Sequence, residues 1–335
     1  MTASRKIRWG ILSTADIGLR KVIPGIKASA HSEVLAIASR DLSRARAAAD
    51  GLGIPKAYGS YEQLLADPEI DAIYNPLPNH LHIPLTLAAA RAGKHVLCEK
   101  PVAITAREAE QLRDCPKDRI VAEAFMIRYH PQWLRARDII RSGELGTVTA
   151  INCVFSYFLD DPENVRNKPD IGGGGLLDIG CYPLTAARFF FEDEPLRVSA
   201  LLERDPRFGT DTQGTVIADF GQGRHLGFTI STLSTNHQRV TVLGTRKKLE
   251  IEIPFNAPTD RPTRIIIDDG TALDGSSARI EAIPATDQYT EQAEAFALAV
   301  LGEKPLPYGV EDAIASMRAL DAMAESDRRR AWVDL

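Results

Sequence analysis

Two short segments of the sequence hold side chains suited to proton and hydride chemistry. Glu99-Lys100-Pro101 places a carboxylate beside an ammonium after an apolar run, and Asp178 precedes Tyr182 by four residues, behind the glycines at 172–175. If the second segment is helical, the carboxylate and the phenol stand on one face of one turn. A phenol can exchange a proton with a substrate oxygen while an ammonium stabilises the charge that develops there. These groups therefore suit oxidation of an alcohol, or the reverse, with a bound hydride carrier.

Each segment also has a plain structural interpretation. Glu-Lys-Pro alone is typical of a solvated turn, and the second segment alone is typical of a capped helix with a buried tyrosine. Pro183 disfavours a helical conformation at Tyr182 and is expected to turn the ring away from Asp178. The presence of both segments in one chain favours the catalytic interpretation, with Lys100, Asp178 and Tyr182 as catalytic and substrate-binding residues.

The elements that position these residues follow from the apolar pattern. Between Ile7 and Phe125, short apolar runs alternate with amphipathic stretches, which is typical of β-α-β units that build a parallel sheet. Strands are expected near residues 7–12, 34–39, 72–74, 95–98 and 121–125. Helices are expected near residues 17–29, 43–51, 61–65, 82–92 and 105–115.

The remainder of the chain has a different pattern. After a helix near 131–142, β-rich runs follow at hairpin spacing, near 148–158, 198–202, 214–220, 225–231, 239–244 and 248–253, and 254–262 has the composition of a loop. Helices near 289–301 and 310–326 close the chain. The sequence thus predicts an α/β protein with a Rossmann domain at 1–125 and, at 126–335, an α+β domain built on a large open, mostly antiparallel sheet.

The turn after the first strand is the expected pyrophosphate site. A dinucleotide fingerprint would place glycine at positions 13, 15 and 18, and here only Gly18 matches, with Ser13 and Ala15 as small replacements. An ordinary strand-to-helix turn is the alternative. The residues expected to contact the cofactor in this turn are Ser13, Thr14, Ala15, Asp16, Ile17 and Gly18.

The end of the second strand bears on the choice of dinucleotide. Where an NAD-binding fold usually presents an acidic residue to the ribose 2′-hydroxyl, this chain has Ser39-Arg40, a hydroxyl and a guanidinium that suit a 2′-phosphate. Asp41 argues in the opposite direction, and Arg40 is alternatively a solvated charge at a helix start. We predict NADP rather than NAD.

Further cofactor contacts are expected at the same edge of the sheet. The loop after the third strand is stiffened by two prolines, and its alternative role is a rigid connection in which Asn79 caps the next helix. Two arginines, Arg128 and Arg166, could meet phosphate, the nicotinamide amide or a sugar hydroxyl, or form surface ion pairs. An aromatic residue, Tyr157, is a candidate substrate contact. The remaining expected cofactor contacts are Pro76, Leu77, Asn79, His82, Glu99 and Lys100.

Composition excludes several classes of protein. The net charge is −5 without a long run of either sign, so no footprint for nucleic acid or an anionic membrane is present. No stretch approaches the length of a membrane-spanning segment or a signal peptide, and the four cysteines have neither disulfide-scaffold nor zinc-ribbon spacing. We expect a cytoplasmic protein with a small-molecule partner and no metal site.

Several motifs resemble those of the glucose-fructose oxidoreductase, inositol dehydrogenase and MocA family. They are Ala-Gly-Lys-His-Val-Leu-Cys-Glu-Lys-Pro at 92–101, Gly-Gly-Gly-Leu-Leu-Asp-Ile-Gly-Cys-Tyr at 173–182, and shorter matches at 8–15, 76–80 and 123–129. The resemblance implies that Lys100, Asp178 and Tyr182 surround the nicotinamide C4 and the substrate carbon. Tyrosine in place of the commoner histidine is similar to the branch with aldose dehydrogenases, dihydrodiol dehydrogenases and aldose-aldose oxidoreductase.

The resemblance and the residues together predict an NADP-dependent oxidoreductase that acts on C1 of an aldose or on a related polyol or sugar carbonyl. Tyr182 would be the acid/base, with its ordinary pKa of about 10 lowered by the Lys100 ammonium and the nicotinamide charge. Asp178 would orient Tyr182, Lys100 or a sugar hydroxyl. The alternatives are a dihydrodiol or anhydrosugar dehydrogenase and a regulator that senses dinucleotide without turnover. The family further implies a homodimer or homotetramer formed through the C-terminal sheet. The residues leave open whether NADP(H) is tightly retained or released in each turnover.

Overall fold

The computed structural model describes residues 5–335 and divides into two compact units. The first unit runs to Tyr129 and takes in Asp287–Ile314, whereas the second comprises His130–Thr286 and Ala315–Leu335. The expected boundary at 125/126 lies close to the first crossing. The chain then returns to the first unit at Asp287, which differs from the expectation of one continuous C-terminal domain.

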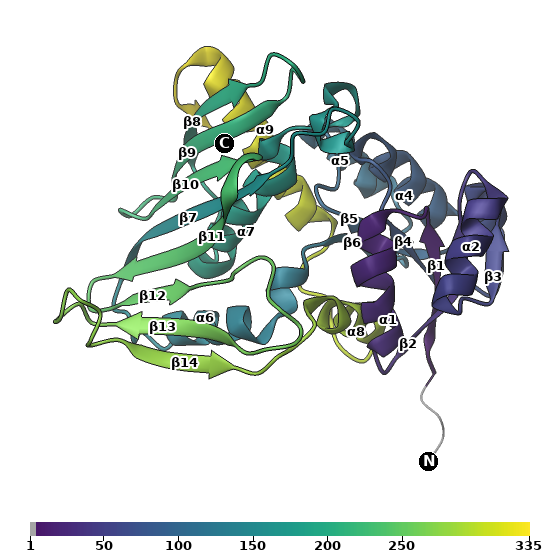
Figure 1. Cartoon of the computed structure of the whole chain (residues 1–335), viewed down its shortest axis with the longest axis horizontal. Helices are drawn as coiled ribbons and strands as arrows, with labels where there is room; N and C mark the ends of the chain where they lie inside the picture. Colours follow the sequence, from purple (N-terminus) through teal and green to yellow (C-terminus); the bar gives the residue numbers. More distant parts are fainter. Residues whose placement is uncertain (1–4) are drawn as a thin grey trace. The chain divides into compact units, whose positions relative to one another are not determined.

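The first unit is built on a six-stranded sheet in the order β3-β2-β1-β4-β5-β6, all of whose pairs are parallel. This is the strand order of a Rossmann fold, with the order reversing between β1 and β4. The strands are β1 (Ile7–Leu12), β2 (Ser32–Ala38), β3 (Lys56–Tyr58), β4 (Ala72–Asn75), β5 (His95–Glu99) and β6 (Val121–Ala124). The helices that connect them are α1 (Ile23–Ala28), α2 (Leu42–Leu52), α3 (Tyr61–Leu65), α4 (His82–Arg91) and α5 (Ala106–Ala109), as Figure 1 shows.

Helix α8 (Gln288–Val300) belongs to this unit because its apolar face completes the core of the Rossmann domain. The Phe296 ring lies 5.1 Å from the ring of the fully buried Trp9. On α1, a Cβ at Gly25 would lie 2.7 Å from the Tyr289 side chain, so glycine permits the close approach of the two helices. The periodicity of α8 indicated a buried face, but it held no information on which core that face would join.

Two predicted helices are less regular than their pattern suggested. The helix after β1 contains a π-helical turn, Gly18–Val22, before α1, and α5 tightens into a 3₁₀ turn at Glu110–Asp114. The three-residue edge strand β3 was not predicted, because a run of that length shows no period.

The second unit is built on a nine-stranded sheet in the order β14-β13-β12-β11-β7-β10-β9-β8-β15. Its only parallel pair in the described chain is β7 with β10, so the prediction of a mostly antiparallel sheet is confirmed. Helices α6 (Pro131–Arg141) and α7 (Cys181–Phe191) pack against the sheet, and α9 (Val310–Arg329) is shared with the first unit (Figure 1). The strands are β7 (Val148–Phe158), β8 (Arg197–Arg204), β9 (Asp211–Asp219), β10 (His225–Ser231), β11 (Leu233–Gly244), β12 (Lys248–Ile251), β13 (Thr263–Asp268), β14 (Arg279–Ile283) and β15 (Val333–Asp334).

Strands β13, β14 and β15 were not predicted. β13 carries three consecutive isoleucines, and β14 has only one buried residue, so neither shows the alternation that indicates a strand with one solvated face. Within residues 5–335, no helix combines the length and the apolar character needed to cross a membrane.

Candidate active site

The turn after β1 has the geometry expected of a dinucleotide loop despite its missing glycines. Ser13 takes a positive φ of 80°, a conformation that favours glycine, and its backbone N–H donates to the carbonyl of Ala38 at 2.9 Å. Its hydroxyl accepts from the N–H of Ala15 at 3.2 Å. The helical segment that follows begins at Asp16, so Ala15 precedes its first residue, and an alanine side chain cannot accept a backbone hydrogen bond. The start of this helix therefore offers backbone donors to an anion.

This turn is joined to the Glu-Lys-Pro segment through the fully buried Tyr74. A Cβ at Gly18 would lie 3.6 Å from the Tyr74 ring and 3.7 Å from the Pro76 ring, which places the helix start directly over β4. The Tyr74 hydroxyl donates to Glu99 Oε1 at 2.7 Å, and burial, together with the Glu99 charge, raises the pKa of this phenol well above its ordinary value. Glu99 is thus held from the side of the dinucleotide loop.

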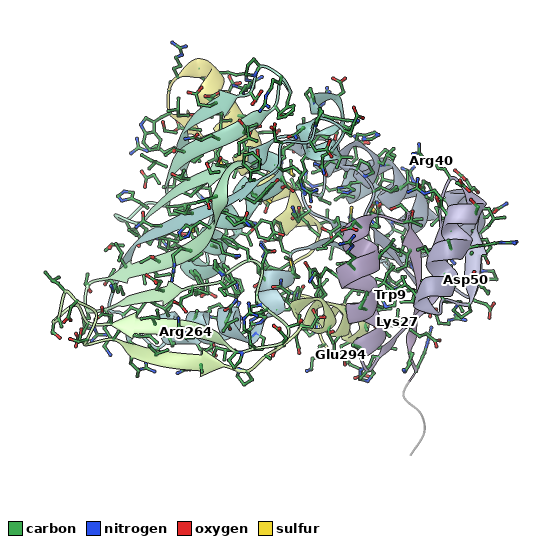
Figure 2. The ribbon with its side chains drawn as sticks, in the orientation of Figure 1. Trp9, Lys27, Arg40, Asp50, Arg264 and Glu294 are labelled. Carbon is green, nitrogen blue, oxygen red and sulfur yellow. The ribbon has the colours of Figure 1, made fainter. Side chains whose placement is uncertain are left out.

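The end of β2 carries the residues predicted to select NADP. The Ser39 hydroxyl accepts from the Asp41 N–H at 3.3 Å, and Arg40 is exposed at one end of α2, as Figure 2 shows. The Asp41 carboxylate caps α2, accepting from the Ser43 N–H at 2.8 Å and from its hydroxyl at 2.6 Å, and these bonds lower the pKa of Asp41. The carboxylate that argued against NADP is therefore engaged in capping a helix.

A second arginine lies beside Arg40. Arg44, in the first turn of α2, and Arg40 both act electrostatically on Tyr61, although burial dominates and raises the pKa of that phenol. The sequence reasoning missed Arg44. Its spacing of four residues from Arg40, across a helix start, was the signal that could have indicated it.

The proline-containing loop after β4 is stabilised from within. The Asn75 amide donates to the His82 carbonyl at 3.1 Å and to the Thr86 hydroxyl at 3.2 Å. The His82 ring is buried, with Nδ1 2.7 Å from the Pro101 carbonyl and Nε2 2.6 Å from the Leu77 carbonyl. The structure thus places His82 between two backbone segments, and its predicted contact with a cofactor stays a prediction.

The Lys100 turn is held by its own backbone. The N–H of Lys100 donates to Glu99 Oε2 at 3.2 Å, and the N–H of Val102 donates to Glu123 Oε1 at 2.8 Å. Glu123 is a buried carboxylate on β6, one strand further along the sheet. The sequence reasoning did not identify it, because a single acidic residue in an apolar strand has no spacing to indicate its partner.

Arg128 lies in a 3₁₀ turn, Met126–Tyr129, that follows β6. Its side chain is 3% exposed, pairs with Asp312 of α9 and lies 4.2 Å over the Tyr308 ring. This environment is that of a buried structural ion pair, and its predicted cofactor contact receives no support from these contacts.

In the second unit, Asp178 is the centre of a polar cluster. Its Oδ2 accepts from the Tyr157 hydroxyl at 2.5 Å and from Arg166 Nε at 3.0 Å. The Asp178 charge is the largest cause of a raised pKa at Arg166, and the phenols of Tyr157 and Tyr182 act in the same direction. Four predicted residues from three separate segments are therefore close neighbours. We call Tyr157, Arg166, Asp178 and Tyr182 the tyrosine cluster.

Tyr182 lies in helical structure, contrary to the expectation from Pro183. The glycine-led segment forms a π-helical turn, Leu176–Gly180, which continues into α7 with Tyr182 as its second residue and Pro183 as its third. Proline is tolerated there because it directly follows a π-helical turn, where the regular i to i−4 hydrogen-bond pattern is already interrupted. The Tyr182 ring is 6% exposed and packs against Phe255, with ring centroids 5.3 Å apart.

The glycines before this helix allow a carboxylate to approach the backbone. A Cβ on Gly174, whose φ is 124°, would lie 2.2 Å from Asp211 Oδ1. The other oxygen of Asp211 accepts from the Leu176 N–H at 2.6 Å, and burial raises the pKa of this carboxyl group. Gly174 is thus needed to admit Asp211, which anchors the turn that carries Asp178.

The fold and these two sets of residues define a dinucleotide-binding oxidoreductase. A model described as an oxidoreductase family with an NAD-binding Rossmann fold matches residues 7–122, and the GFO/IDH/MocA C-terminal domain matches residues 133–250. The chain belongs to the GFO/IDH/MocA family, as its motifs predicted.

Three relatives illustrate the range of the family. The chain is 42% identical over 334 residues to D-xylose 1-dehydrogenase (NADP(+)) 2 of Haloferax volcanii, which covers 98% of this chain and 99% of the relative. It is 30% identical, with a TM-score of 0.89, to the structure of a 3-ketoreductase from Actinomadura kijaniata in complex with NADP and TDP-benzene, covering 96% of this chain and 98% of the other. It is 27% identical, also with a TM-score of 0.89, to aldose-aldose oxidoreductase from Caulobacter crescentus complexed with glycerol, covering 99% and 100%. The predicted resemblance to the branch with aldose dehydrogenases, dihydrodiol dehydrogenases and aldose-aldose oxidoreductase is thereby confirmed.

Proposed function

We propose that this protein is an NADP-dependent oxidoreductase that oxidises C1 of an aldose to the lactone. The observation that carries the proposal is the tyrosine cluster, in which a phenol of low exposure has a guanidinium and a carboxylate as neighbours. Such a phenol suits proton exchange with a sugar oxygen. The similarity to a D-xylose 1-dehydrogenase along nearly the whole chain supports C1 of an aldose as the reacting carbon.

The residues at the end of β2 fit an NADP 2′-phosphate. Ser39 offers a hydroxyl, and Arg40 and Arg44 offer two guanidinium groups, while Asp41 is occupied at the helix N-cap. Arginine pairs with phosphate through charge-assisted hydrogen bonds, so this set favours NADP over NAD. The backbone of the Ser13 turn and the helix that begins at Asp16 would hold the pyrophosphate. When bound, the nicotinamide accepts the hydride that leaves C1.

The protein's own residues would manage the proton and the charge. Tyr182 takes the proton of the C1 hydroxyl, and the positive charge of Arg166 favours the phenolate that this role requires. Lys100 donates a hydrogen bond to the reacting oxygen and stabilises its developing negative charge. Asp178 keeps Arg166 in place and orders the Tyr157 hydroxyl, which is then a candidate contact for a sugar hydroxyl.

Reduction of a keto sugar carried on a nucleotide is a second candidate. It is favoured by the similarity in fold and sequence to the Actinomadura 3-ketoreductase, whose structure contains TDP-benzene. The same Tyr182 and Lys100 would then act in the reverse direction, with the phenol giving its proton to the carbonyl oxygen.

The test is a substrate panel with both dinucleotides. The change in NADPH absorbance is followed with D-xylose, D-glucose, other aldoses and a dihydrodiol, and in the reverse direction with keto sugars free and linked to dTDP. We expect aldose oxidation with NADP⁺ and a lower kcat/KM with NAD⁺. Turnover confined to the dTDP-linked substrates would overturn C1 oxidation in favour of the second candidate, and dinucleotide binding without turnover of any panel member would indicate a regulator. Mass spectrometry of the purified protein reports whether NADP(H) is retained.

A further inference from the structure

The Glu99–Val102 turn is held by buried side chains from three neighbouring elements, two of which contact its backbone. Tyr74 of β4 donates to Glu99 at 2.7 Å, and Glu123 of β6 accepts from the N–H of Val102 at 2.8 Å. His82 of α4 contacts the carbonyl of Pro101 at 2.7 Å. A surface turn does not need buried groups on three sides. A turn that must present one side chain accurately does.

Like Tyr74, which joins the dinucleotide turn to Glu99, His82 reaches two functional segments. Its Nδ1 lies against the carbonyl that follows Lys100 in the chain, and its Nε2 lies 2.6 Å from the carbonyl of Leu77 in the proline-containing loop. Both segments leave the carboxyl edge of the Rossmann sheet, from β5 and β4, which are paired in register. The ring therefore links the loop expected to meet the cofactor to the turn that carries Lys100.

The chemistry of the ring makes this link sensitive to substitution. His82 is 1% exposed, and burial, opposed by its two carbonyl neighbours and assisted by the charges of Lys100 and His80, lowers its pKa to about 4. At neutral pH the ring then carries one N–H for two carbonyl oxygens. Its backbone is in turn fixed by the Asn75 amide, which donates to the His82 carbonyl at 3.1 Å. Removal of the imidazole leaves two buried carbonyls facing an apolar gap.

We propose that His82 is a positioning residue for Lys100, acting through the Pro101 carbonyl, and that it couples the Leu77 loop to the catalytic lysine. The proposal rests on the proposed function, since it requires Lys100 to act in catalysis. It assigns to His82 no contact with the substrate. Its consequence is that the loss of kcat in His82 variants comes through Lys100.

The experiment is a double-mutant cycle of His82→Leu with Lys100→Met. We expect His82→Leu to lower kcat by roughly 10- to 100-fold, as misplacement of a catalytic group does, with a much smaller change in the sugar KM. In the Lys100→Met background, His82→Leu should cause no further loss of kcat, because its route to the reaction is already removed. His82→Gln, which keeps one N–H donor, should restore part of the activity.

A matched control is available on the same strand as the lysine turn. His95, at the opposite end of β5, also has a pKa lowered to about 4 by burial, and its Nδ1 accepts from the Ile120 N–H at 3.0 Å. His95→Gln and His82→Leu should lower the urea midpoint of unfolding by comparable amounts, because each removes a buried imidazole. In His95→Gln, however, kcat should stay within about twofold of wild type, because the position of Lys100 does not change.

The outcomes separate the proposal from the function on which it rests. Equal losses of kcat in His82→Leu and His95→Gln, or losses that add in the double mutant with Lys100→Met, would overturn the positioning role. If Lys100→Met itself keeps near-wild-type kcat, the proposed function fails first, whatever the His82 variants do.

Discussion

The two units hold their candidate catalytic residues by different physical means. In the first unit, the Lys100 turn is fixed by hydrogen bonds from buried groups to the backbone, with Glu123 and His82 both less than 10% exposed. In the second unit, the tyrosine cluster is organised by charge, through an ion pair between Asp178 and the 43% exposed Arg166. Buried backbone bonds are insensitive to salt, whereas a partly exposed ion pair is screened by it. The first arrangement suits rigid presentation of a lysine, and the second suits a proton-exchanging phenol whose charge changes during turnover.

The largest loss of kcat is expected when the residue proposed to contact the substrate is replaced in either unit. Tyr182→Phe and Lys100→Met should each lower kcat by about 10²- to 10⁴-fold, since each removes a proton-transfer or charge-stabilising group. Binding of NADPH, followed by its fluorescence, should persist in both. Near-wild-type turnover in both variants would contradict the assigned roles.

The charged arrangement can be tested by removing its centre. Asp178→Asn leaves the Tyr157 and Arg166 side chains without a carboxylate, and we expect kcat to fall by roughly 10- to 100-fold, as loss of an orienting group does. Wild-type kcat should decline as salt is raised towards 1 M, because Arg166 is partly exposed, and Asp178→Asn should lose that dependence. An Asp178→Asn enzyme with unchanged kcat and unchanged salt response would show that the ion pair is structural. A matched control is Arg264→Gln, which removes a partly exposed ion pair with Glu252 elsewhere in the same unit.

The fold was more readily predicted than the contacts of the site. The Rossmann sheet follows from alternating apolar and amphipathic runs, and β7 and β10 follow from runs whose bounds match the structure. Helix α8 shows the limit, because its apolar face indicated burial but not that Phe296 would meet Trp9, 287 positions earlier in the chain. A contact between residues far apart in sequence leaves no periodic pattern from which it could be predicted.

The site residues differ in the same way: those with a local sequence pattern were predicted, and those that act on distant segments were not. Asp178 and Tyr182 were linked by helical spacing, and Ser39 and Arg40 by their place after a strand. Arg166 was a candidate, but its pairing with Asp178 depends on how the glycine-led segment folds back to it. Asp211 and Glu123 were missed because each acts across strands on a single backbone N–H.

The preference for NADP⁺ or NAD⁺ tests the residues at the end of β2 and the start of α2. Ser39→Asp introduces a carboxylate near the expected 2′-phosphate, and we expect kcat/KM for NADP⁺ to fall by about 10-fold or more relative to that for NAD⁺, through like-charge repulsion. Arg44→Gln should weaken NADP⁺ alone by a smaller factor. Asp50→Asn, at the far end of α2 in Figure 2, is the control and should leave the preference unchanged. Identical dinucleotide preference in Ser39→Asp and wild type would refute the NADP assignment.

Acid stability is expected to reflect buried neutral histidines in both units. Burial lowers the pKa of His82, His95 and His130 to about 4. Because the unfolded value is about 6.5, each contributes stability that is present above that pH and lost as the pH falls towards 4, on the order of 1–3 kcal/mol each. Urea midpoints measured from pH 7 to pH 4.5 should fall accordingly. The fall should be shallower in His130→Gln, and an equal slope in that variant would argue against its burial as a neutral ring.

The smallest effect on turnover is expected from the sheet face of the second unit that does not face α7. Leu201, Thr215, Thr229 and Val154 lie side by side on four neighbouring strands, and Leu201 is 62% exposed. Ile217, 50% exposed, lies two residues after Thr215 on the same face. Exposed leucine, isoleucine and valine side chains on one face suit self-association, and we expect a homodimer or homotetramer through this face. Leu201→Lys with Ile217→Lys should lower the mass measured by light scattering, since lysine charges would be desolvated in such an interface. Turnover at saturating substrate should stay within about twofold of wild type, because the substituted side chains point away from the helix that carries Tyr182. An unchanged mass would place any subunit contact on another surface.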